Sequence, residues 1–313
     1  MRILLVVNAF ASSVTARNTV VVHRALSQRN NVEVVETNRR GHATRFAQDA
    51  ARRGLDVVIG YGGDGTLNEV ATGVAGTETA LGVLPGGSTN VFARTLGMVN
   101  DPVQAVKQLA AGIAAADIGP IGLGQVNGRY FCFHTGVGYD AAVVDEVEQR
   151  ASLKRWLGHP LFIYASLKTW SVRYDRHHPH FGVSGTTAGG TPFRVADGYF
   201  TIVLNTNPYT YLGNRPIDLS PAATLDRGLV AVTFRTMQAT AILRSLAGAL
   251  RGGGVRPSDH LDVRTDIDDL TITCVDDRAF PYQVDGDFLG DTRELRFRHR
   301  PDAVRLVRPA PAA

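Results

Sequence analysis

The chain of 313 residues is poor in cysteine and in long apolar runs, and each shortage excludes a class of protein. Two cysteines, Cys132 and Cys274, are too few for a disulfide scaffold, and they lack the spacing of a zinc site. No window holds the roughly 18 consecutive apolar residues that a membrane-spanning helix needs. The apolar start, residues 3–8, is too short for a secretory signal and predicts a buried strand. We therefore expect a cytoplasmic protein.

Charge is also scarce, and its placement is uneven. Charged residues make up 20% of the chain, apolar residues 44%, and the net charge is +4, as in an ordinary globular protein. Residues 150–176 hold six basic residues and one acid, a local net charge of +5, so that the rest of the chain sums to about −1. This balance argues against nucleic acid as the main partner.

The first hundred or so residues alternate short β-branched runs with helical stretches. Strands are predicted over 3–8, 32–36, 57–61 and 81–84, and helices over 14–28, 42–53, 66–75, 89–96 and 102–113. Such alternation predicts a parallel sheet with right-handed crossovers. Ligands of these sheets bind beyond the carboxyl ends of the strands.

After about residue 118 the pattern changes to short β-rich segments separated by turns, typical of an antiparallel sandwich or barrel. Strands are expected at 129–134, 199–205, 229–234, 270–274 and 294–298, and helices near 139–149, 160–174 and 237–250. The predicted fold is an N-terminal parallel-sheet α/β domain over 1–118 and an antiparallel β-rich sandwich domain over 119–300. Residues 301–313 are assigned to a C-terminal segment that packs back on the first domain.

The clearest motif is Gly-Gly-Asp-Gly-Thr at residues 62–66, which follows an apolar strand and opens a predicted helix. Glycine lets the backbone approach a ligand closely, and the unpaired N–H groups of a helix start favour phosphate. Thr66 and Glu69 also fit a capping box. The alternative interpretation is a tight turn in which Asp64 is an ordinary turn acid.

A second glycine-rich turn, Pro-Gly-Gly-Ser-Thr-Asn at residues 85–90, follows the next strand. Loops from successive parallel strands would lie side by side at one end of the sheet and form a cradle for a polyphosphate. Neither loop carries the lysine of a Walker motif, and neither matches the dinucleotide fingerprint. Residues 8–13 would add an amide and two hydroxyls at the same edge.

Two further patterns carry carboxylates. Asp285 and Asp287 flank a glycine at the end of a strand, where such a pair suits a general base or a magnesium ligand. The alternative for Asp285 is an ordinary Asp-Gly hairpin turn. Residues 135–141 lie between a strand and a helix, and the bland alternative for them is a tight turn with Asp140 near the helix start.

Taken in series, these motifs resemble the diacylglycerol kinase catalytic-domain family, the soluble bacterial lipid kinases related to sphingosine and ceramide kinases. The matching elements are residues 62–69, 85–94, 136–141 and 285–286, and their order and separations fit along nearly the whole chain. A lone Gly-Gly-Asp-Gly loop also occurs in NAD kinases and phosphofructokinases. Only the four elements together are specific to the diacylglycerol kinase catalytic-domain family. The resemblance implies a two-domain kinase whose α/β domain binds nucleotide, with ATP and magnesium in the cleft between the domains.

Carried over position by position, the resemblance also implies roles for single residues. The nucleotide would be bound by Asn8, Ser12, Thr37, Gly62, Gly63, Asp64, Gly65, Thr66, Asn68, Gly87, Thr89 and Asn90. Asp285 would be the general base that takes the proton from the acceptor hydroxyl, with Asp64 and Asp287 as further catalytic carboxylates. Asp64 and Asp226 would be magnesium ligands.

The chain departs from the family pattern at four positions. The usual Asn-Pro after the first strand ends in Ala9, and the acid that often follows the second loop is Val91. The usual Asp-Gly-Glu ends in Asp287, which keeps the charge but shortens its reach. An Asp-Asp-Gly that holds a structural magnesium in some members has Arg227 at its centre, which argues against that second metal site.

The activity that these residues predict is transfer of the γ-phosphoryl group of ATP to a lipid hydroxyl, with diacylglycerol giving phosphatidic acid. Alternatives on the same fold are a sphingoid base, another lipid alcohol or a soluble acceptor such as NAD. A nucleotide-binding regulator without turnover is a further alternative, against which the presence of both Asp64 and Asp285 argues.

The basic segment 150–176 also holds Trp156, Phe162, Tyr164 and Trp170. Basic residues with interfacial aromatics predict peripheral contact with anionic headgroups at the inner face of the cell membrane. The alternative is that helix 160–174 belongs to the core, because it is apolar around much of its circumference. The resemblance also suggests a homodimer.

Overall fold

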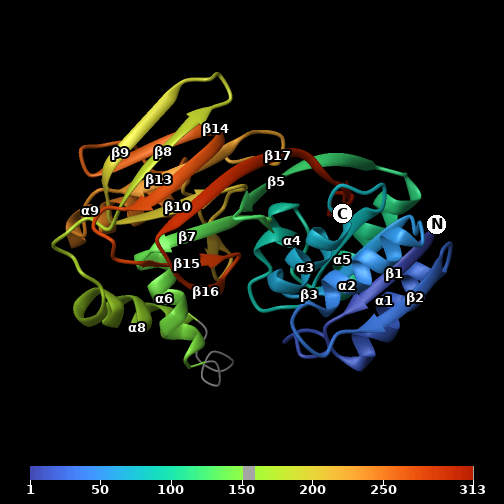
Figure 1. Ribbon diagram of the computed structural model, residues 1–313. Helices are drawn as coiled ribbons and strands as arrows, with labels where there is room; N and C mark the ends of the chain where they lie inside the picture. The colour runs from blue at the N-terminus through green and yellow to red at the C-terminus, as the bar shows by residue number, and fades with distance from the viewer. Residues whose placement is uncertain (151–158, 313) are drawn as a thin grey trace. The chain divides into compact units, whose positions relative to one another are not determined.

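The computed structural model describes residues 1–150 and 159–312 (Figure 1). The chain divides into two compact units, one formed by Met1–Leu123 with Pro301–Ala313 and the other by Gly124–Arg300. The sequence places the boundary at residue 118, a few residues earlier. We describe each unit by itself.

The first unit is built on a parallel sheet in the order β17-β4-β3-β1-β2. Its strands are β1 (Arg2–Val7), β2 (Asn31–Glu36), β3 (Val57–Gly62), β4 (Ala80–Pro85) and the end of β17 (Glu294–Val307). Its helices are α1 (Ala16–Ser27), α2 (His42–Arg52), α3 (Asp64–Val74), α4 (Val91–Thr95) and α5 (Pro102–Ala114). The predicted parallel α/β fold of this part of the chain is confirmed.

Burial and capping explain these elements. Strands β3 and β4 are buried at every position, as expected for a parallel sheet covered on both faces. Thr15 and Asp101 cap α1 and α5 by accepting a backbone N–H, and Pro102 occupies the first turn of α5. Helix α1 packs with α5 and α2 packs with α3. The register pairs Val7 with Tyr61, so the loops after β1 and β3 leave the same edge of the sheet.

The second unit is an antiparallel β sandwich in which the long strand β14 belongs to both sheets. Its strands are β5 (Ile118–Val126, shared with the first unit), β6 (Arg129–Phe131), β7 (His134–Gly138), β8 (Phe181–Thr187), β9 (Pro192–Gly198), β10 (Phe200–Leu204), β11 (Thr210–Leu212), β12 (Arg215–Ile217), β13 (Leu229–Phe234), β14 (Leu261–Cys274), β15 (Phe280–Val284), β16 (Asp287–Thr292) and the start of β17. One end of β14 pairs with β13 in the series β16-β15-β7-β10-β13, and the other end pairs with β8 and β17.

The core of this unit lies between the two sheets. It contains Val137 and Val203 from the first sheet and Phe181 and Phe297 from the second, all buried. A second cluster, which includes Phe200 and Phe234, covers the other face of β10 and β13. The predicted antiparallel sandwich is confirmed.

The helices of this unit are α6 (Tyr139–Glu148), α8 (His159–Lys168), the π-helical turn η1 (Thr169–Arg173) and α9 (Ala239–Leu250). In Figure 1, α8 lies at the end of the unit opposite the β8–β9 hairpin. One strand prediction is wrong: residues 129–134 form two strands rather than one. Residues 132 and 133 leave the sheet because a side chain, Asp285, accepts their N–H groups.

Candidate functional site

The two glycine-rich loops lie against each other at the carboxyl edge of the first sheet. The Gly86 N–H donates to the Gly62 carbonyl at 2.8 Å. A Cβ at Gly86 would stand 2.8 Å from the Gly62 Cα, and a Cβ at Gly87 would stand 2.8 Å from the Gly63 Cα. The predicted side-by-side arrangement is confirmed. The absence of side chains at these glycines lets the two loops pack together. It would also let a ligand approach the backbone closely.

Asp64 links the first loop to the helix that follows the second. Its two carboxylate oxygens accept the N–H groups of Val91 and Phe92, each at 3.0 Å, at the N-terminus of α4. Burial raises the pKa of this carboxyl, and the two backbone donors partly oppose that rise. Each carboxylate oxygen has a second lone pair, so Asp64 can bind a ligand while it still accepts these two N–H groups.

The predicted capping box is wrong, because α3 begins at Asp64 with Gly63 as its cap. Thr66 is therefore the third residue of the helix, and its hydroxyl accepts from the Asn8 amide at 3.0 Å. The Glu69 carboxylate instead accepts the N–H groups of Gly41 and Ala43, at 2.8 and 3.0 Å, at the start of α2. The motif residues thus bind neighbouring segments rather than their own helix end.

The other residues predicted to bind nucleotide also belong to the first unit. Thr37 is buried and follows β2, and its N–H donates to the Val7 carbonyl. Ser12 and Thr89 lie in loops after β1 and β4, and Asn68 is buried one turn into α3. Asn90 adopts a left-handed conformation with φ of 51°, and its side chain bonds both the N–H and the carbonyl of Gly87 at 2.7 and 2.8 Å.

Sequence reasoning missed Ser13 as the residue that docks the first loop. Its N–H donates to Gly86 at 2.8 Å and its hydroxyl to Gly87 at 3.3 Å. Two adjacent serines gave no signal to choose between them, because only the folded loop decides which one faces the second glycine turn.

In the second unit, Asp285 and Gly286 form a two-residue hairpin turn between β15 and β16. Both residues have positive φ, 48° and 82°, and Val284 pairs with Asp287. The structural alternative, an Asp-Gly hairpin, is therefore present. The Asp285 side chain is buried nonetheless, and its carboxylate accepts the N–H groups of residues 132, 133 and 134 at 2.7, 3.0 and 3.1 Å.

These three donors stabilise the ionised form of Asp285. A carboxylate held in this way is well oriented to accept a hydrogen bond or a proton from a ligand hydroxyl. Asp287 is less buried, and one of its oxygens lies 3.5 Å from the Arg129 guanidinium.

A buried polar cluster supports the Asp285 turn. The Asp140 carboxylate accepts from the Tyr209 hydroxyl and from the Gln283 amide. Gly136 lies inside β7, rather than in the turn expected from the sequence, and a Cβ there would stand 1.6 Å from an Asp140 oxygen. Glycine at 136 therefore makes the space that the Asp140 carboxylate occupies. Burial lowers the pKa of the neighbouring His134 to about 4.

The two predicted magnesium ligands differ in how well they fit a metal. Magnesium commonly binds through one or two carboxylates together with substrate phosphates and water, so Asp64 between the glycine loops fits that role. Asp226 is exposed beside Arg227, and a hydrogen bond from Thr224 lowers the pKa of its carboxyl. Within residues 1–150 and 159–312, His, Cys, Asp and Glu side chains form no group of three that could hold a metal. Asp226 therefore does not fit the predicted magnesium site.

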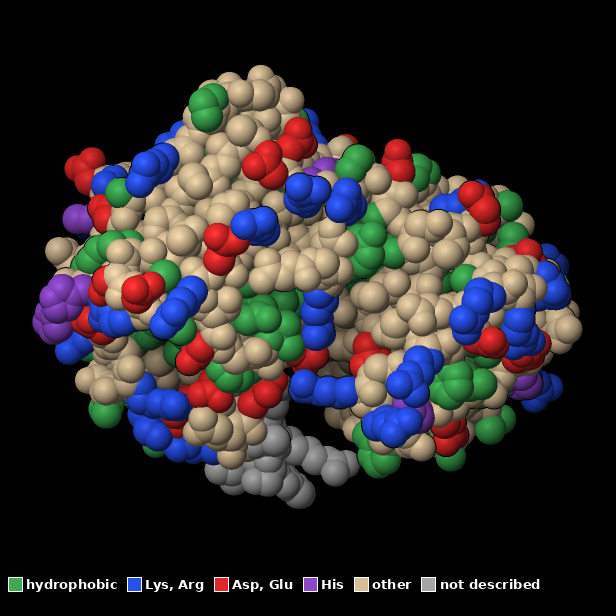
Figure 2. Space-filling view, viewed as in Figure 1, with side chains coloured by type: hydrophobic (Ala, Val, Ile, Leu, Met, Phe, Trp, Pro, Cys, Tyr) green, Lys and Arg blue, Asp and Glu red, His purple; other side chains and the backbone are tan. Residues whose placement is uncertain are grey.

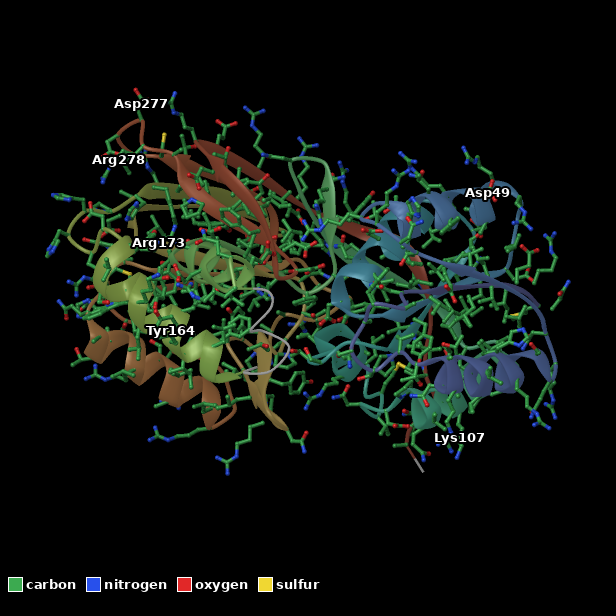
Figure 3. The ribbon with its side chains drawn as sticks, turned by 90° about the horizontal axis from the view of Figure 1, so that it is seen from below. Asp49, Lys107, Tyr164, Arg173, Asp277 and Arg278 are labelled. Atoms are coloured by element: carbon green, nitrogen blue, oxygen red, sulfur yellow. The ribbon has the colours of Figure 1, made fainter. Side chains whose placement is uncertain are left out.

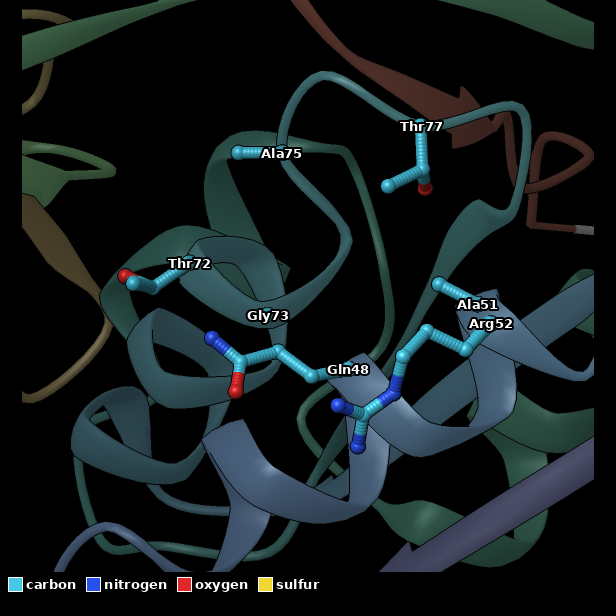
Figure 4. A pocket seen from close by; sticks show the side chains of 7 residues that line it. All are labelled: Gln48, Ala51, Arg52, Thr72, Gly73, Ala75 and Thr77. Atoms are coloured by element: carbon cyan, nitrogen blue, oxygen red, sulfur yellow. The ribbon is translucent and has the colours of Figure 1, made fainter.

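The first unit also has a cavity of about 430 Å³ between α2 and α3, lined in part by Gln48, Arg52 and Thr72 (Figure 4). It lies at the C-terminal ends of both helices. Helix α3 starts at the glycine loop, and the first of its residues to line this cavity is Thr72, about 12 Å further along the helix. The cavity is therefore separate from the predicted nucleotide loops.

Helix α8 is apolar on two faces. Leu161 and Ala165 are buried on one face, whereas Ile163 and Leu167 are 58% and 64% exposed. The alternative that this helix belongs to the core therefore explains its buried face but not its exposed face. Lys154, Arg155 and Trp156 of the basic segment lie outside the described residues.

The basic residues near α8 are partly neutralised. Arg150, Lys168 and Arg173 all pair with the buried Glu146, and Arg176 lies over the Trp170 ring. Arg173 and Tyr164 are labelled in Figure 3. On the face shown in Figure 2, basic and acidic side chains are interspersed. In the described parts of the chain, no helix is both long enough and apolar enough to cross a membrane.

A parallel α/β unit followed by an antiparallel sandwich is a fold that also occurs in solved structures of other proteins. Two solved structures of putative diacylglycerol kinases from Bacillus anthracis str. Sterne align with TM-scores of 0.75 and 0.74, at 22% and 21% identity. Each alignment covers 98% of this chain and 96% of the other. At this identity the likeness shows the fold.

Sequence comparison gives the family. The family model of the diacylglycerol kinase catalytic domain matches residues 2–121. A probable lipid kinase YegS-like of Pseudomonas aeruginosa is 30% identical over 274 residues, 86% of this chain and 82% of that protein. A diacylglycerol kinase of Bacillus subtilis is 41% identical over 121 residues, which is 38% of each chain. The chain belongs to the diacylglycerol kinase catalytic-domain family, a family of kinases.

Proposed function

We propose that this chain transfers the γ-phosphoryl group of ATP to a lipid hydroxyl, with diacylglycerol as the acceptor and phosphatidic acid as the product. The observation that carries the proposal is the backbone contact between the two glycine loops. It sets the start of α3 against the second glycine turn, so that phosphate groups can approach the backbone closely there. The names of the relatives supply the lipid acceptor.

Magnesium, held through Asp64 and the phosphates, would offset the charge that develops on the transferred group. The chain's own contribution is to position the phosphates through backbone N–H groups and to keep Asp64 in place through Val91 and Phe92. Asn8 and Ser13 fix the loop after β1 against the same edge.

Asp285 acts as the base that accepts the proton of the acceptor hydroxyl. Phosphoryl transfer passes through a loose transition state, and a well-oriented carboxylate can receive the proton as the hydroxyl oxygen attacks the phosphorus. The three N–H donors from residues 132–134 supply that orientation.

The experiment is transfer from labelled ATP, with magnesium, to diacylglycerol in mixed micelles, with sphingosine, ceramide and NAD assayed in parallel. We expect labelled phosphatidic acid. Asp285→Asn should lower kcat by roughly 100-fold or more and leave the affinity for ATP within about threefold. Asp291→Asn, an exposed carboxylate on the adjacent strand β16, is the matched control and should leave kcat unchanged.

An asparagine at 285 offers one acceptor oxygen to three N–H donors, so urea unfolding of the variant must accompany the kinetics. Transfer to another acceptor would keep the mechanism and change the substrate. ATP binding without transfer to any acceptor would make a nucleotide-binding regulator the better description.

We further propose that the exposed face of α8 contacts the bilayer that holds this substrate. Phe162, Ile163, Tyr164 and Leu167 are all exposed on it. Since Glu146 already pairs with three of the nearby cations, apolar insertion contributes more to this contact than headgroup charge does.

A further inference from the structure

The Asp285–Gly286 turn is held from inside the second unit by one uncharged side chain. Gln283 is fully buried on β15, and its Oε1 accepts the Gly286 N–H at 2.8 Å. That N–H belongs to the peptide that joins Asp285 to Gly286. Its orientation therefore sets the backbone from which the Asp285 side chain projects.

The orientation of the Gln283 amide is determined by its partners. Its Nε2 donates to an Asp140 oxygen at 2.9 Å, and a carboxylate can only accept. Its Oε1 must then face the Gly286 N–H, which can only donate. A flipped amide would set a donor against a donor and an acceptor against an acceptor.

Asp140 is in turn fixed by its other neighbours. Its second oxygen accepts from the Tyr209 hydroxyl. Burial and the Asp140 charge raise the pKa of Tyr209 well above its usual value, so the hydroxyl remains a donor. Gly136 pairs with Gln283 across β7 and β15 and leaves the space that the carboxylate needs. The contacts run in series from Tyr209 through Asp140 and Gln283 to Gly286.

We propose that Gln283 is a positioning residue for Asp285, aligned by Asp140 and Tyr209. This inference rests on the proposed function, in which Asp285 receives the proton. Gln283 acts by fixing the Asp285–Gly286 peptide, and it exchanges no proton itself. An Asp-Gly sequence favours a turn with positive φ at both residues, and the hydrogen bond from the Gly286 N–H to the Gln283 amide oxygen holds the peptide between them in place.

Gln283→Glu tests this with almost no change in shape. It replaces the donor that faces Asp140 with a second carboxylate oxygen, and the two groups repel. Asp140→Asn alone either sets two NH₂ groups against each other or turns its NH₂ towards Tyr209, whose hydroxyl must then reverse from donor to acceptor. The double variant Asp140→Asn with Gln283→Glu restores a donor facing an acceptor and keeps an acceptor for the Gly286 N–H.

We expect each single variant to lower kcat by about 10- to 100-fold with the KM for ATP within about threefold, and the double variant to return to within about threefold of the native kcat. Tyr209→Phe, which keeps the ring, should lower kcat in the same direction by a smaller factor. Gln238→Glu, an exposed glutamine of the same unit, is the control. Native kcat in the single variants, or a double variant no better than either single one, would overturn the proposal.

Amide exchange separates this proposal from the proposed function. The Gly286 N–H should exchange at least about tenfold faster in Gln283→Glu than in the native chain, and it should recover protection in the double variant. If the native chain transfers phosphate to none of the acceptors, the proposed function fails while this exchange still reports on the turn. Unchanged exchange at Gly286 would refute the positioning role whatever the acceptor.

Discussion

Three of the carboxylates that the motifs single out bind backbone N–H groups where regular structure is interrupted. Asp64 binds the start of α4, Glu69 the start of α2, and Asp285 the break between β6 and β7. A buried N–H without a partner is costly, so each carboxylate stabilises the local fold. Asp64 and Asp285 have this structural role in addition to their proposed roles in phosphoryl transfer. The same N–H groups that they stabilise also hold their carboxylates in a fixed orientation.

His134 makes stability depend on pH. Burial lowers its pKa to about 4, despite the opposing charge of Asp140, whereas an unfolded chain has a His pKa of about 6.5. Between these values the unfolded chain binds more protons, so the free energy of unfolding falls as the pH drops from 6.5 towards 4. We expect this residue to contribute a loss of about 2 kcal/mol between pH 7 and pH 5, measured by urea unfolding.

His134→Gln should remove that share of the pH dependence, whereas His260→Gln, at an exposed position, should keep it. An unaltered slope in His134→Gln would mean that His134 is protonated in the native state.

At the scale of elements, Glu69 connects two helices. Its carboxylate accepts two N–H groups from the first turn of α2 while it belongs to α3. Replacing it with alanine leaves both donors without this partner and removes a negative charge from a helix N-terminus. We expect Glu69→Ala to lower the free energy of unfolding by about 1–3 kcal/mol in urea denaturation.

Glu78→Ala is the comparison, since that side chain is 93% exposed and pairs with Arg305 at the surface. It should cost less than about 1 kcal/mol. Equal losses in the two variants would contradict a capping role for Glu69.

The second prediction at this scale concerns α8. Leu167→Glu puts a charge on its exposed apolar face and should lower binding to vesicles of anionic and neutral lipid by about tenfold or more, measured by sedimentation. Leu243→Glu makes the same change on α9, where the leucine is 61% exposed. That variant should bind vesicles like the native chain, and an equal loss in both would mean that the contact is not specific to α8.

At the scale of the whole molecule, the chain returns to its first unit at the end. Leu306 pairs with Leu81 of β4, Ala303 accepts the Gly76 N–H, and Ala310 bonds with the Gln108 side chain and backbone. The first unit is therefore completed by a segment that follows the whole second unit in the sequence.

Leu306→Ala should lower the stability of the first unit by about 2–5 kcal/mol, because the side chain is buried in its core. Hydrogen exchange should show loss of protection in β4 above all. Its neighbour Arg305 is exposed and pairs with Glu78, so Arg305→Ala should cost less than about 1 kcal/mol. Unchanged protection of β4 in Leu306→Ala would show that the first unit is stable without the returning strand.

The sequence by itself determined the class of each unit and the position of the glycine loops. Strand and helix periodicity is local, so the parallel α/β part, the antiparallel part and the edge that carries residues 62–66 and 85–90 follow from short windows. The Asp-Gly turn at 285 is equally local, since only its own two residues need positive φ.

Only the tertiary structure decided what the polar side chains bind. Glu69 bonds to residues 26 and 28 positions away, Asp64 to residues 27 and 28 positions away, and Asp285 to residues more than 150 positions away. No local pattern contains such partners. A buried carboxylate takes whichever N–H groups the folded chain leaves unpaired nearby, and those groups are set by the packing of distant elements.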